Sequence, residues 1–328
     1  MLGSNDYDFH KKIKKAGRQI IILDHHEAEH VSKDAIVINN QLSNYPNKEL
    51  SGAGVTWKFC KFLDKLLNKN FADNYLDLVA LGNDADMMSL QSVETKHLIN
   101  KGFKTENVKN PFIYEMANKN SFSLKGKLTP IGVAFYIAPF VNSMVRSGTQ
   151  EEKQLLFKSM LKFEAFKEIP SNKRGHKQGE MERVVDQAIR TATNVKNRQT
   201  RAVDTAMEEL EKQIKDNNMM EHKVLLFLLE PNKVDKNVAG LCANKIMAKY
   251  QRPCCILTKT ETKDLADFYK FGDGDKEFAI ITSYEGSARG CDKVGINNFK
   301  DICAETGAIM YAERTSRSIR TRHFRRKN

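Results

Sequence analysis

The stretch that decides the fold class reads Gln19-Ile20-Ile21-Ile22-Leu23-Asp24-His25-His26. Its apolar, β-branched part predicts a buried strand, and a second short run, Ala35 to Ile38, predicts another. Between Gly52 and Asn70 apolar residues recur at helical spacing, which predicts an amphipathic helix that packs on the sheet: Val55, Phe59, Phe62, Leu63, Leu66 and Leu67. Strands alternating with helices predict an α/β fold with parallel strands.

The polar end of the first run is the main candidate for chemistry. Asp24, His25 and His26 follow the strand directly, and ligands in open α/β sheets bind outside the carboxyl ends of strands. An acid and two imidazoles can supply a metal ligand, a group that orients it and a proton donor to phosphate. Three consecutive residues cannot all bind one ion, so we expect divided roles. The alternative is a solvated polar stretch that follows the strand by accident.

A second segment with acidic residues supports the interpretation of Asp24, His25 and His26 as a functional site. Tyr75 to Leu81 is predicted to be helical and leads into Gly82-Asn83-Asp84-Ala85-Asp86-Met87-Met88, where a glycine and two acids interrupt an apolar pattern. Carboxylates there are expected to face a cleft or a ligand. Together with the first motif, Asp86 supplies what a metal-dependent phosphodiesterase requires, since carboxylates neutralise the ions that hold the attacking and leaving oxygens.

The pattern changes after the first α/β segment. A long polar helix is predicted from about Glu180 to Asn217, with one apolar face made by Val185, Ile189, Ala192, Val195, Ala202, Ala206, Leu210 and Ile214. A second α/β pattern follows, with strands Lys223–Leu229, Cys254–Leu257 and Glu277–Thr282 and a helix Asn237–Tyr250. We therefore expect a first domain at 1–178, a connector at 179–218, a second domain at 219–313 and a basic tail at 314–328.

Composition narrows the class of protein. The formal net charge is +12, but seven Lys and Arg and no acid lie between Arg314 and Asn328, so the rest of the chain carries about +5 by subtraction. Six cysteines form no C-x-x-C pair, which favours reduced, buried thiols over structural zinc. Neither an apolar leader nor a membrane-length apolar run is present, so a cytoplasmic protein that does not enter the membrane is expected.

Four motifs in order resemble the DHH phosphoesterase superfamily. The run Ile21 to His26 and the segment Leu81 to Met88 are similar to its motifs III and IV. Two further stretches resemble the RecJ branch: Ala138 to Arg146 keeps a Pro, an Asn and an Arg of RecJ nucleases, and Gly286-Ser287-Ala288-Arg289-Gly290 with Gly240-Leu241-Cys242-Ala243 resembles the associated DHHA1 domain. The similarity runs from about Ser4 to Glu313.

The resemblance implies an architecture and a reaction. It implies a DHH domain and a DHHA1 domain joined by a long helical connector, with single-stranded DNA in a cleft between them and exonucleolytic hydrolysis from the 5′ end. It implies Mn²⁺ or Mg²⁺, two ions in the intact site. His25 and Asp86 would be metal ligands, His26 would contact the scissile phosphate, and Asp24 would orient a neighbour. Phosphates would be bound by Asn142, Arg146, Ser287 and Arg289. A monomer is expected, with a single-strand-binding protein as a further partner.

This chain departs from the family pattern in three places. Asp84 stands where the family has an apolar residue, so Asp86 is the preferred ligand. The aspartates of motifs I and II would lie before Ser4, and with His25 and Asp86 alone two ions would be poorly held. After Glu313 the family pattern gives way to an Arg/Ser-rich sequence. We interpret the chain as an internal piece of a longer gene that ends in a frameshift, the alternative being a basic arm that grips nucleic acid.

Two other functions fit the same residues. The first is a phosphodiesterase for short oligonucleotides or cyclic dinucleotides, because relatives with the same two domains act on those. The second is a catalytically inactive protein that binds single strands, whose affinity would not depend on metal and would fall with salt.

Overall fold

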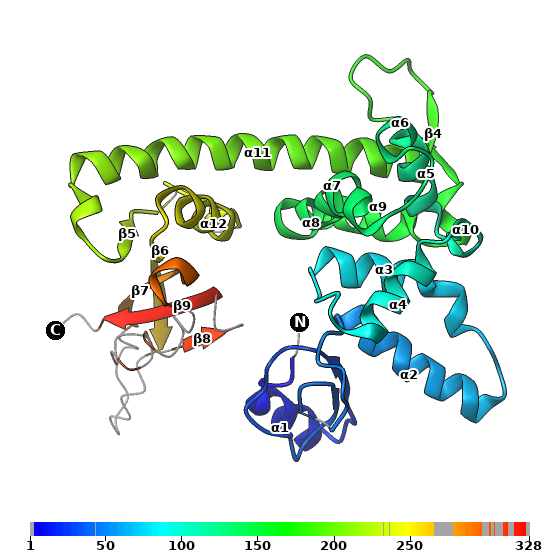
Figure 1. Cartoon of the computed structure of the whole chain (residues 1–328), viewed down its shortest axis with the longest axis horizontal. Coiled ribbons are helices and arrows are strands. Elements are labelled where there is room, and N and C mark those ends of the chain that lie inside the picture. The colour runs from blue at the N-terminus through cyan, green and yellow to red at the C-terminus, as the bar shows by residue number, and fades with distance from the viewer. Residues whose placement is uncertain are drawn as a thin grey trace. The chain divides into compact units, whose positions relative to one another are not determined.

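The computed structural model describes residues 3–42, 44–231, 233–235, 237–265, 278–296, 302, 305, 311–313 and 318–325. The chain divides into two compact units, residues 1–197 and 198–328 (Figure 1). The division falls inside the long helix that the sequence predicts. The finer boundaries at 178 and 218 remain predictions.

The first unit contains a parallel pair of strands, β1 (Ile21–Asp24) and β2 (Ile36–Asn39). Asp24 lies opposite Asn39 in the register, so both strands end at the same edge. The predicted strands are thus confirmed, but their full burial is not. Ile21 and Ile36 are more than half exposed, because the apolar cluster beneath the sheet touches only the carboxyl-terminal residues Leu23 and Ile38.

Helix α1 (Tyr7–Lys15) precedes the strands, and α2 (Gly52–Leu67) follows them. Ser51 caps α2 by accepting a hydrogen bond from the Gly54 amide, and Val55 is buried in the cluster with Leu50, as predicted. The prediction that the whole apolar face of α2 packs on the sheet is wrong, because Phe62, Leu66 and Leu67 are more than half exposed. Two short strands cover only the first turns of the helix.

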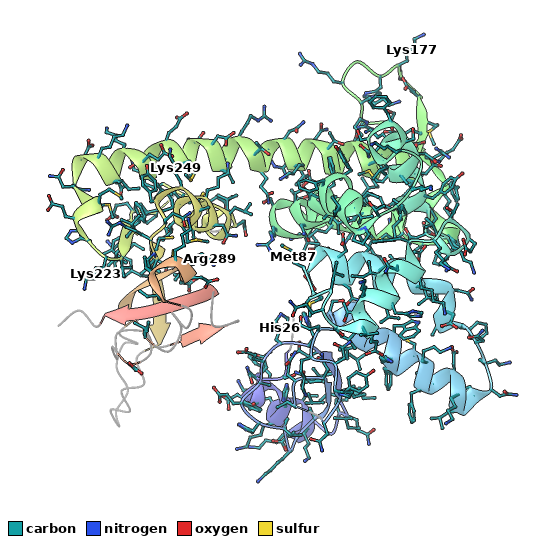
Figure 2. All side chains as sticks on the ribbon, viewed as in Figure 1. His26, Met87, Lys177, Lys223, Lys249 and Arg289 are labelled. Carbon is teal, nitrogen blue, oxygen red and sulfur yellow. The ribbon has the colours of Figure 1, made fainter. Side chains whose placement is uncertain are left out.

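Helix α3 (Leu76–Ala85) begins after a 3₁₀ turn, η1 (Ala72–Tyr75), and continues through Gly82, past Leu81 where the predicted helical stretch ends. Gly82 allows α2 to approach, since a Cβ there would lie 2.6 Å from the Cβ of Ala53. The helix ends at Asp86, and the next residue, Met87, has a left-handed φ of 54° and projects into solvent (Figure 2). Gly82 therefore serves the close packing of α3 against α2.

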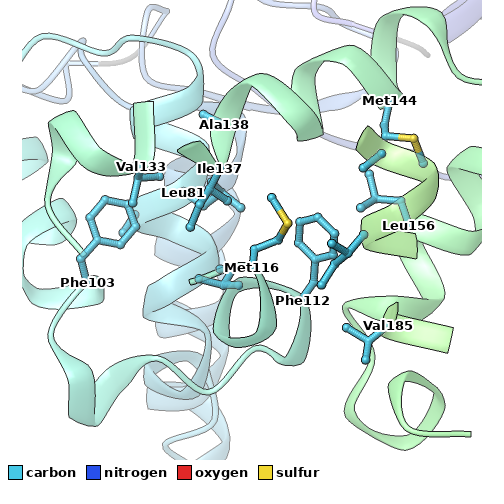
Figure 3. Close-up of a cluster of buried hydrophobic side chains, with 14 of the residues drawn as sticks. Leu81, Phe103, Phe112, Met116, Val133, Ile137, Ala138, Met144, Leu156 and Val185 are labelled. Atoms are coloured by element: carbon cyan, nitrogen blue, oxygen red, sulfur yellow. The ribbon is translucent and has the colours of Figure 1, made fainter. Parts of the chain in front are cut away.

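A helical layer completes the first unit. Its core contains Phe112, Ile113, Met116, Val133, Ile137 and Met144, all essentially inaccessible to solvent (Figure 3). A short antiparallel hairpin, β3 (Glu168–Pro170) and β4 (Met181–Arg183), follows the helices. The helices of this layer are α4 (Val93–Gly102), η2 (Thr105–Asn107), α5 (Pro111–Lys119), α6 (Ser121–Leu124), α7 (Pro130–Tyr136), α8 (Ala138–Ser147), α9 (Gln150–Ser159) and α10 (Lys162–Ala165).

Helix α11 (Val184–Asp216) contributes to both units through the apolar face that the sequence predicts. Val185, Ile189, Ala192 and Val195 belong to the core of the first unit. Val203, Ala206, Leu210 and Ile214 belong to a separate core in the second. None of the helices in the described residues is both long and apolar enough to span a membrane.

The second unit is a five-stranded sheet in the order β5-β6-β7-β9-β8. Its strands are β5 (Leu225–Leu229), β6 (Cys254–Leu265), β7 (Phe278–Arg289), β8 (Tyr311–Glu313) and β9 (Ser318–Arg325), with α12 (Ala239–Tyr250) and the short turns η3 (Met219–Glu221) and η4 (Asp292–Val294). Among the strand pairs that the structure describes in this unit, β5–β6 is the parallel one and the others are antiparallel. The predicted strands and helix are confirmed, although β6 and β7 are longer than predicted.

Two further predictions concern this unit. Cys242, Cys254, Cys255 and Cys291 are free and buried, and in the first unit Cys60 is free and half-buried, as expected for reduced thiols; Cys303 lies outside the described residues. The segment 314–328 was expected to be a tail outside the domain. Within it, β9 pairs with β7 and β8, whereas 314–317 and 326–328 lie outside the described residues.

Candidate active site

The carboxylate of Asp24 organises the edge where β1 ends. Its Oδ2 accepts hydrogen bonds from the Ser4 amide and hydroxyl, both at 2.8 Å. Its Oδ1 accepts from the His25 amide at 2.8 Å, the His26 amide at 3.2 Å and the His26 ring Nδ1 at 2.7 Å. Both oxygens of this buried carboxylate therefore already accept hydrogen bonds within the protein, so we do not regard Asp24 as a metal ligand.

The environment of Asp24 fixes its charge. Burial by itself raises the pKa of this carboxyl, but the hydrogen bonds from His26 and Ser4 outweigh burial and hold its pKa far below the ordinary value of 3.8. An ionised carboxylate only accepts hydrogen bonds, so Nδ1 of His26 carries the proton. The other ring nitrogen, Nε2, is thereby directed away from Asp24, and the His26 side chain is more than half exposed (Figure 2).

Asn39 and Ser4 complete this arrangement. The Asn39 amide nitrogen donates to the Ser4 hydroxyl and to the backbone carbonyl of His26, both at 2.9 Å. Neither residue was predicted as part of the site. The available signal was the Asn39-Asn40 pair at the end of the second strand, because parallel strands bring their carboxyl ends to one edge.

His25 points in a different direction from its neighbours. Its Nε2 lies 3.9 Å from Oδ2 of Asp86, and its side chain is 17% exposed. Its ring lies against Gly52 at the N-terminus of α2. Burial and the nearby His26 lower the pKa of His25, and the charges of Asp86 and Asp24 oppose this shift. A neutral imidazole at pH 7 retains a lone pair that can bind a cation.

The two acids at the end of α3 differ in environment. Asp86 is half exposed and faces His25. Asp84 is partly enclosed, its Oδ2 has no hydrogen-bond partner in the structure, and burial raises its pKa to about 6. The neighbouring Asn83 is buried and accepts from the Ser51 amide at 2.9 Å, which ties the end of α3 to the start of α2. Of the two acids, Asp86 is the one that lies beside a predicted ligand.

Helix α8 brings the third predicted motif to the same place. The Asn142 side-chain amide donates to the carbonyl of Ala85 at 3.2 Å and so binds the last turn of α3, one residue before Asp86. Arg146 follows four residues later on α8, on the same face of the helix, and is exposed. The structure thus brings Asn142 to the candidate site as a contact to backbone.

The remaining predicted residues lie in the second unit, at the end of β7. Arg289 donates from Nε to the Asn244 side chain at 2.5 Å and from a terminal nitrogen to the Gly240 carbonyl at 3.3 Å (Figure 2). A Cβ at Gly240 would lie 3.0 Å from Arg289 and 3.3 Å from the Ser287 hydroxyl. The two DHHA1-like motifs therefore meet where α12 begins, and Gly240 makes room for both side chains.

The next question is whether the side chains at this site could coordinate a divalent cation. Among the described residues no group of three or more His, Cys, Asp and Glu side chains is arranged to hold a metal ion. His25 Nε2 and Asp86 Oδ2 are 3.9 Å apart, and an ion about 2.1 Å from each donor fits between them. These residues suit one ion that completes its coordination with water, and they do not suit a pair of ions.

Comparisons with known proteins agree with these motifs. Residues 2–83 match the family model "DHH family, N-terminal domain". The chain is 36% identical over 312 residues to YorK of Bacillus subtilis (strain 168), described as an SPbeta prophage-derived single-strand DNA-specific exonuclease, covering 95% of this chain and 50% of that protein. It is 27% identical to the single-stranded-DNA-specific exonuclease RecJ of the same organism, covering 78% and 29%.

A solved structure has the same fold. RecJ of Thermus thermophilus in complex with Mn²⁺ aligns with a TM-score of 0.69 and 16% sequence identity, covering 98% of this chain and 41% of that one. The two-domain α/β architecture is therefore the RecJ fold. The chain spans half or less of the length of these relatives.

Proposed function

The chain carries the N-terminal domain of the DHH family and is a homologue of single-strand DNA-specific exonucleases, and on that premise we propose that it hydrolyses phosphodiester bonds of single-stranded DNA. The observation that carries the proposal is the approach of His25 to Asp86 beside an Asp24–His26 pair at one strand edge. Hydrolysis from the 5′ end is part of the proposal and rests on the resemblance.

A divalent cation, Mn²⁺ or Mg²⁺, is the proposed cofactor. His25 and Asp86 would hold it, and a bound divalent ion supplies a more acidic water and neutralises charge on phosphate. The RecJ structure bound to Mn²⁺ supports this choice of ion. The second ion of the intact family site has no ligand set among the described residues, so no step is assigned to it.

The chain's own residues have distinct proposed roles. Asp24 is a positioning residue, because it holds Nδ1 of His26 and directs Nε2 outward to donate to, or accept from, the scissile phosphate group. Asn142 holds the end of α3, and Arg146 is placed one turn along the same face to bind a phosphate. In the second unit Ser287 and Arg289 would bind further phosphates at the start of α12, where the helix dipole favours an anion.

The partner is proposed to be single-stranded DNA. A single-strand-binding protein and a monomeric state remain predictions from the resemblance. A cytoplasmic location agrees with DNA processing and stays a proposal as well.

The test is degradation of 5′-labelled single-stranded DNA with Mn²⁺, without metal, and by His25→Ala and Asp86→Asn variants. Manganese-dependent cleavage that both substitutions reduce by about a hundredfold or more would support the proposal. His97→Ala on α4 is the matched control and should retain full activity. Cleavage that persists in His25→Ala would refute the assignment of the site. A dinucleotide substrate in parallel separates an exonuclease from a phosphodiesterase of short oligonucleotides.

One observation favours a second candidate function. The described residues contain no cluster of three metal-binding side chains. If the metal is therefore not held, the chain would bind single-stranded DNA without cleaving it. Salt-sensitive binding that needs no metal, without any cleavage, would support this candidate.

A further inference from the structure

The hairpin between the helical layer and α11 has no role in the site described above. Its strands β3 and β4 pair over only three residues each, and the loop between them, residues 172–179, is exposed throughout. Figure 1 shows this loop projecting beyond the helices. A loop that buries no side chain at its tip contributes little to the core of the first unit. We call residues 168–183 the basic hairpin.

The root of the basic hairpin is anchored to α11. Glu182 on β4 is buried and pairs with Arg190, and Gln187 donates to Glu182 at 2.8 Å and to the Pro170 carbonyl at 3.0 Å. Arg190 also donates to the Asn172 side chain at 2.7 Å. Buried charges that are bonded to each other hold a segment in a defined orientation. The hairpin is therefore an ordered projection.

The tip of the basic hairpin has a turn of defined geometry. Gly175 and Gly179 have φ of 78° and 80°, a conformation that other residues rarely adopt. The Ser171 amide donates to the Glu180 carbonyl, and the Glu180 amide donates to the Lys177 carbonyl. The Lys177 amide also donates to the Glu180 carboxylate at 3.1 Å, which closes the turn. An anion at the tip would therefore be bound by side chains.

The charges divide between root and tip. At the root Arg183 pairs with Asp186, Arg190 pairs with Glu182, and Lys173 lies 3.8 Å from Glu180. At the tip Arg174 and Lys177 have no carboxylate within ion-pair distance in the part of the chain that the structure describes. The Glu180 carboxylate contacts the backbone amide of Lys177 and not its ammonium group. Cations that form no ion pair and stand on an exposed loop are typical of a surface that contacts a polyanion.

We infer that the basic hairpin is a second nucleic-acid contact, which binds the phosphates of a single strand far from the bond that is cleaved. Figure 2 shows Lys177 at one extreme of the first unit, well apart from His26. A short oligonucleotide at His26 cannot reach Lys177, but a long strand can. The identity of the polyanion as single-stranded DNA rests on the proposed function, whereas the presence of a polyanion contact rests on the hairpin alone.

The test compares the full chain with the Arg174→Gln/Lys177→Gln double variant. The ligands are labelled thymidine oligonucleotides of about 30 and about 5 nucleotides, bound at several salt concentrations. Each phosphate contact on a single strand contributes about 0.7 to the slope of log K against log salt, so the variant's slope should be smaller by about 1.4, with roughly tenfold weaker binding of the long strand near 0.1 M salt. Binding of the short strand should not change.

Lys65→Gln/Lys69→Gln removes the same charge from exposed residues in the last turn of α2 and just after it, and is the matched control. An equal loss in this control, or an unchanged slope in the hairpin variant, would overturn the inference. Suppose that cleavage requires His25 but the hairpin variant binds the long strand as well as the parent chain does. The proposed function would then stand, and the hairpin contact would be refuted. Binding of the parent chain to anionic lipid vesicles but not to the long strand would also overturn it.

Discussion

At the scale of residues, Asp24 is the centre of the candidate site. It gathers donors from Ser4, His25 and His26, which approach it from two segments of the chain. Ser4 is in turn bonded to Asn39 on the next strand. A carboxylate with this many donors keeps its charge, and that charge selects the tautomer of His26. The position of the imidazole is therefore a consequence of the buried acid.

Replacing Asp24 with asparagine should destabilise the fold in a pH-dependent way. An asparagine cannot accept from all these donors, so we expect the free energy of unfolding to fall by about 2 kcal/mol at pH 7. Because folding lowers the pKa of Asp24, its contribution is present above the ordinary value of 3.8 and is lost as pH falls below it. Chemical denaturation across pH should show the two proteins converging in acid.

The matched control is Asp8→Asn, an exposed acid in the first turn of α1. It should change stability by about 0.5 kcal/mol or less. Equal stability of Asp24→Asn and the parent at pH 7 would contradict the role of Asp24 as the organising group.

At the scale of elements, α2, α3 and α4 hold the site by contacts at their ends. Asn83 on α3 binds the amide of Ser51 at the start of α2. Glu94, in the first turn of α4, accepts from Tyr45 at 2.8 Å and from Asn47 at 2.9 Å and pairs with Lys58 of α2. The loop after β2 is thereby fixed between two helices.

Substituting Glu94 with glutamine tests this connection. Burial raises the pKa of Glu94, but bonds from Lys58, Asn47 and Tyr45 outweigh it and lower the pKa. The carboxylate therefore stabilises the fold above its ordinary value of 4.5, and the contribution is lost as pH falls below that value. We expect Glu94→Gln to lower the unfolding free energy by about 1 kcal/mol at pH 7, measured by denaturation, since the pair is partly exposed.

Glu106→Gln, an exposed acid on η2, is the control and should leave the pH profile unchanged. If Glu94→Gln and the parent lost stability in parallel as the pH fell through the ordinary carboxyl value of 4.5, Glu94 would not be the group responsible.

Adding a methyl group to α3 at Gly82 should separate it from α2. The added Cβ would lie 2.6 Å from that of Ala53, a distance that forces the helices to move. The expected cost of overpacking, about 1–3 kcal/mol, exceeds the gain in helix propensity of up to about 1 kcal/mol. Gly82→Ala should thus lower the melting temperature. Gly52→Ala, whose Cβ would meet only a ring carbon at 3.6 Å, should not; a similar loss in both would argue against the close approach.

At the scale of the whole molecule, two cores share one helix. The first half of α11 packs into the helical layer, and its second half packs under the sheet of the second unit. Each core has its own fully buried side chains, such as Met116 in the first and Leu210 in the second. Separate cores predict separate unfolding of the two units.

Hydrogen exchange measures this separation. Leu210→Ala should destabilise the second unit by about 2–5 kcal/mol and speed amide exchange in β5, while α5 and α7 keep their protection. Met116→Ala should have the opposite pattern. Equal acceleration of exchange in both units for either variant would mean that the molecule unfolds as one cooperative body.

Much of the fold and part of the site follow from the sequence by itself. The apolar run before Asp24 specifies a strand that ends just before His25 and His26, because alternating or continuous apolar patterns depend only on near neighbours. The apolar face of α11 and the start of α12 are set in the same local way. The motif residues that match the DHH family were therefore recognisable without coordinates.

Only the tertiary structure decided which side chains meet. Asn39 reaches Ser4 across 35 residues, and Asn142 reaches the end of α3 across 57. In the sequence Gly82 is one of the residues that interrupt an apolar pattern, and only the structure shows its close approach to Ala53. The second half of α2 is predicted to be buried and is exposed. Periodicity specifies the apolar face of an element, but what covers that face depends on partners that are distant in the chain, and so does the approach of Asp86 to His25.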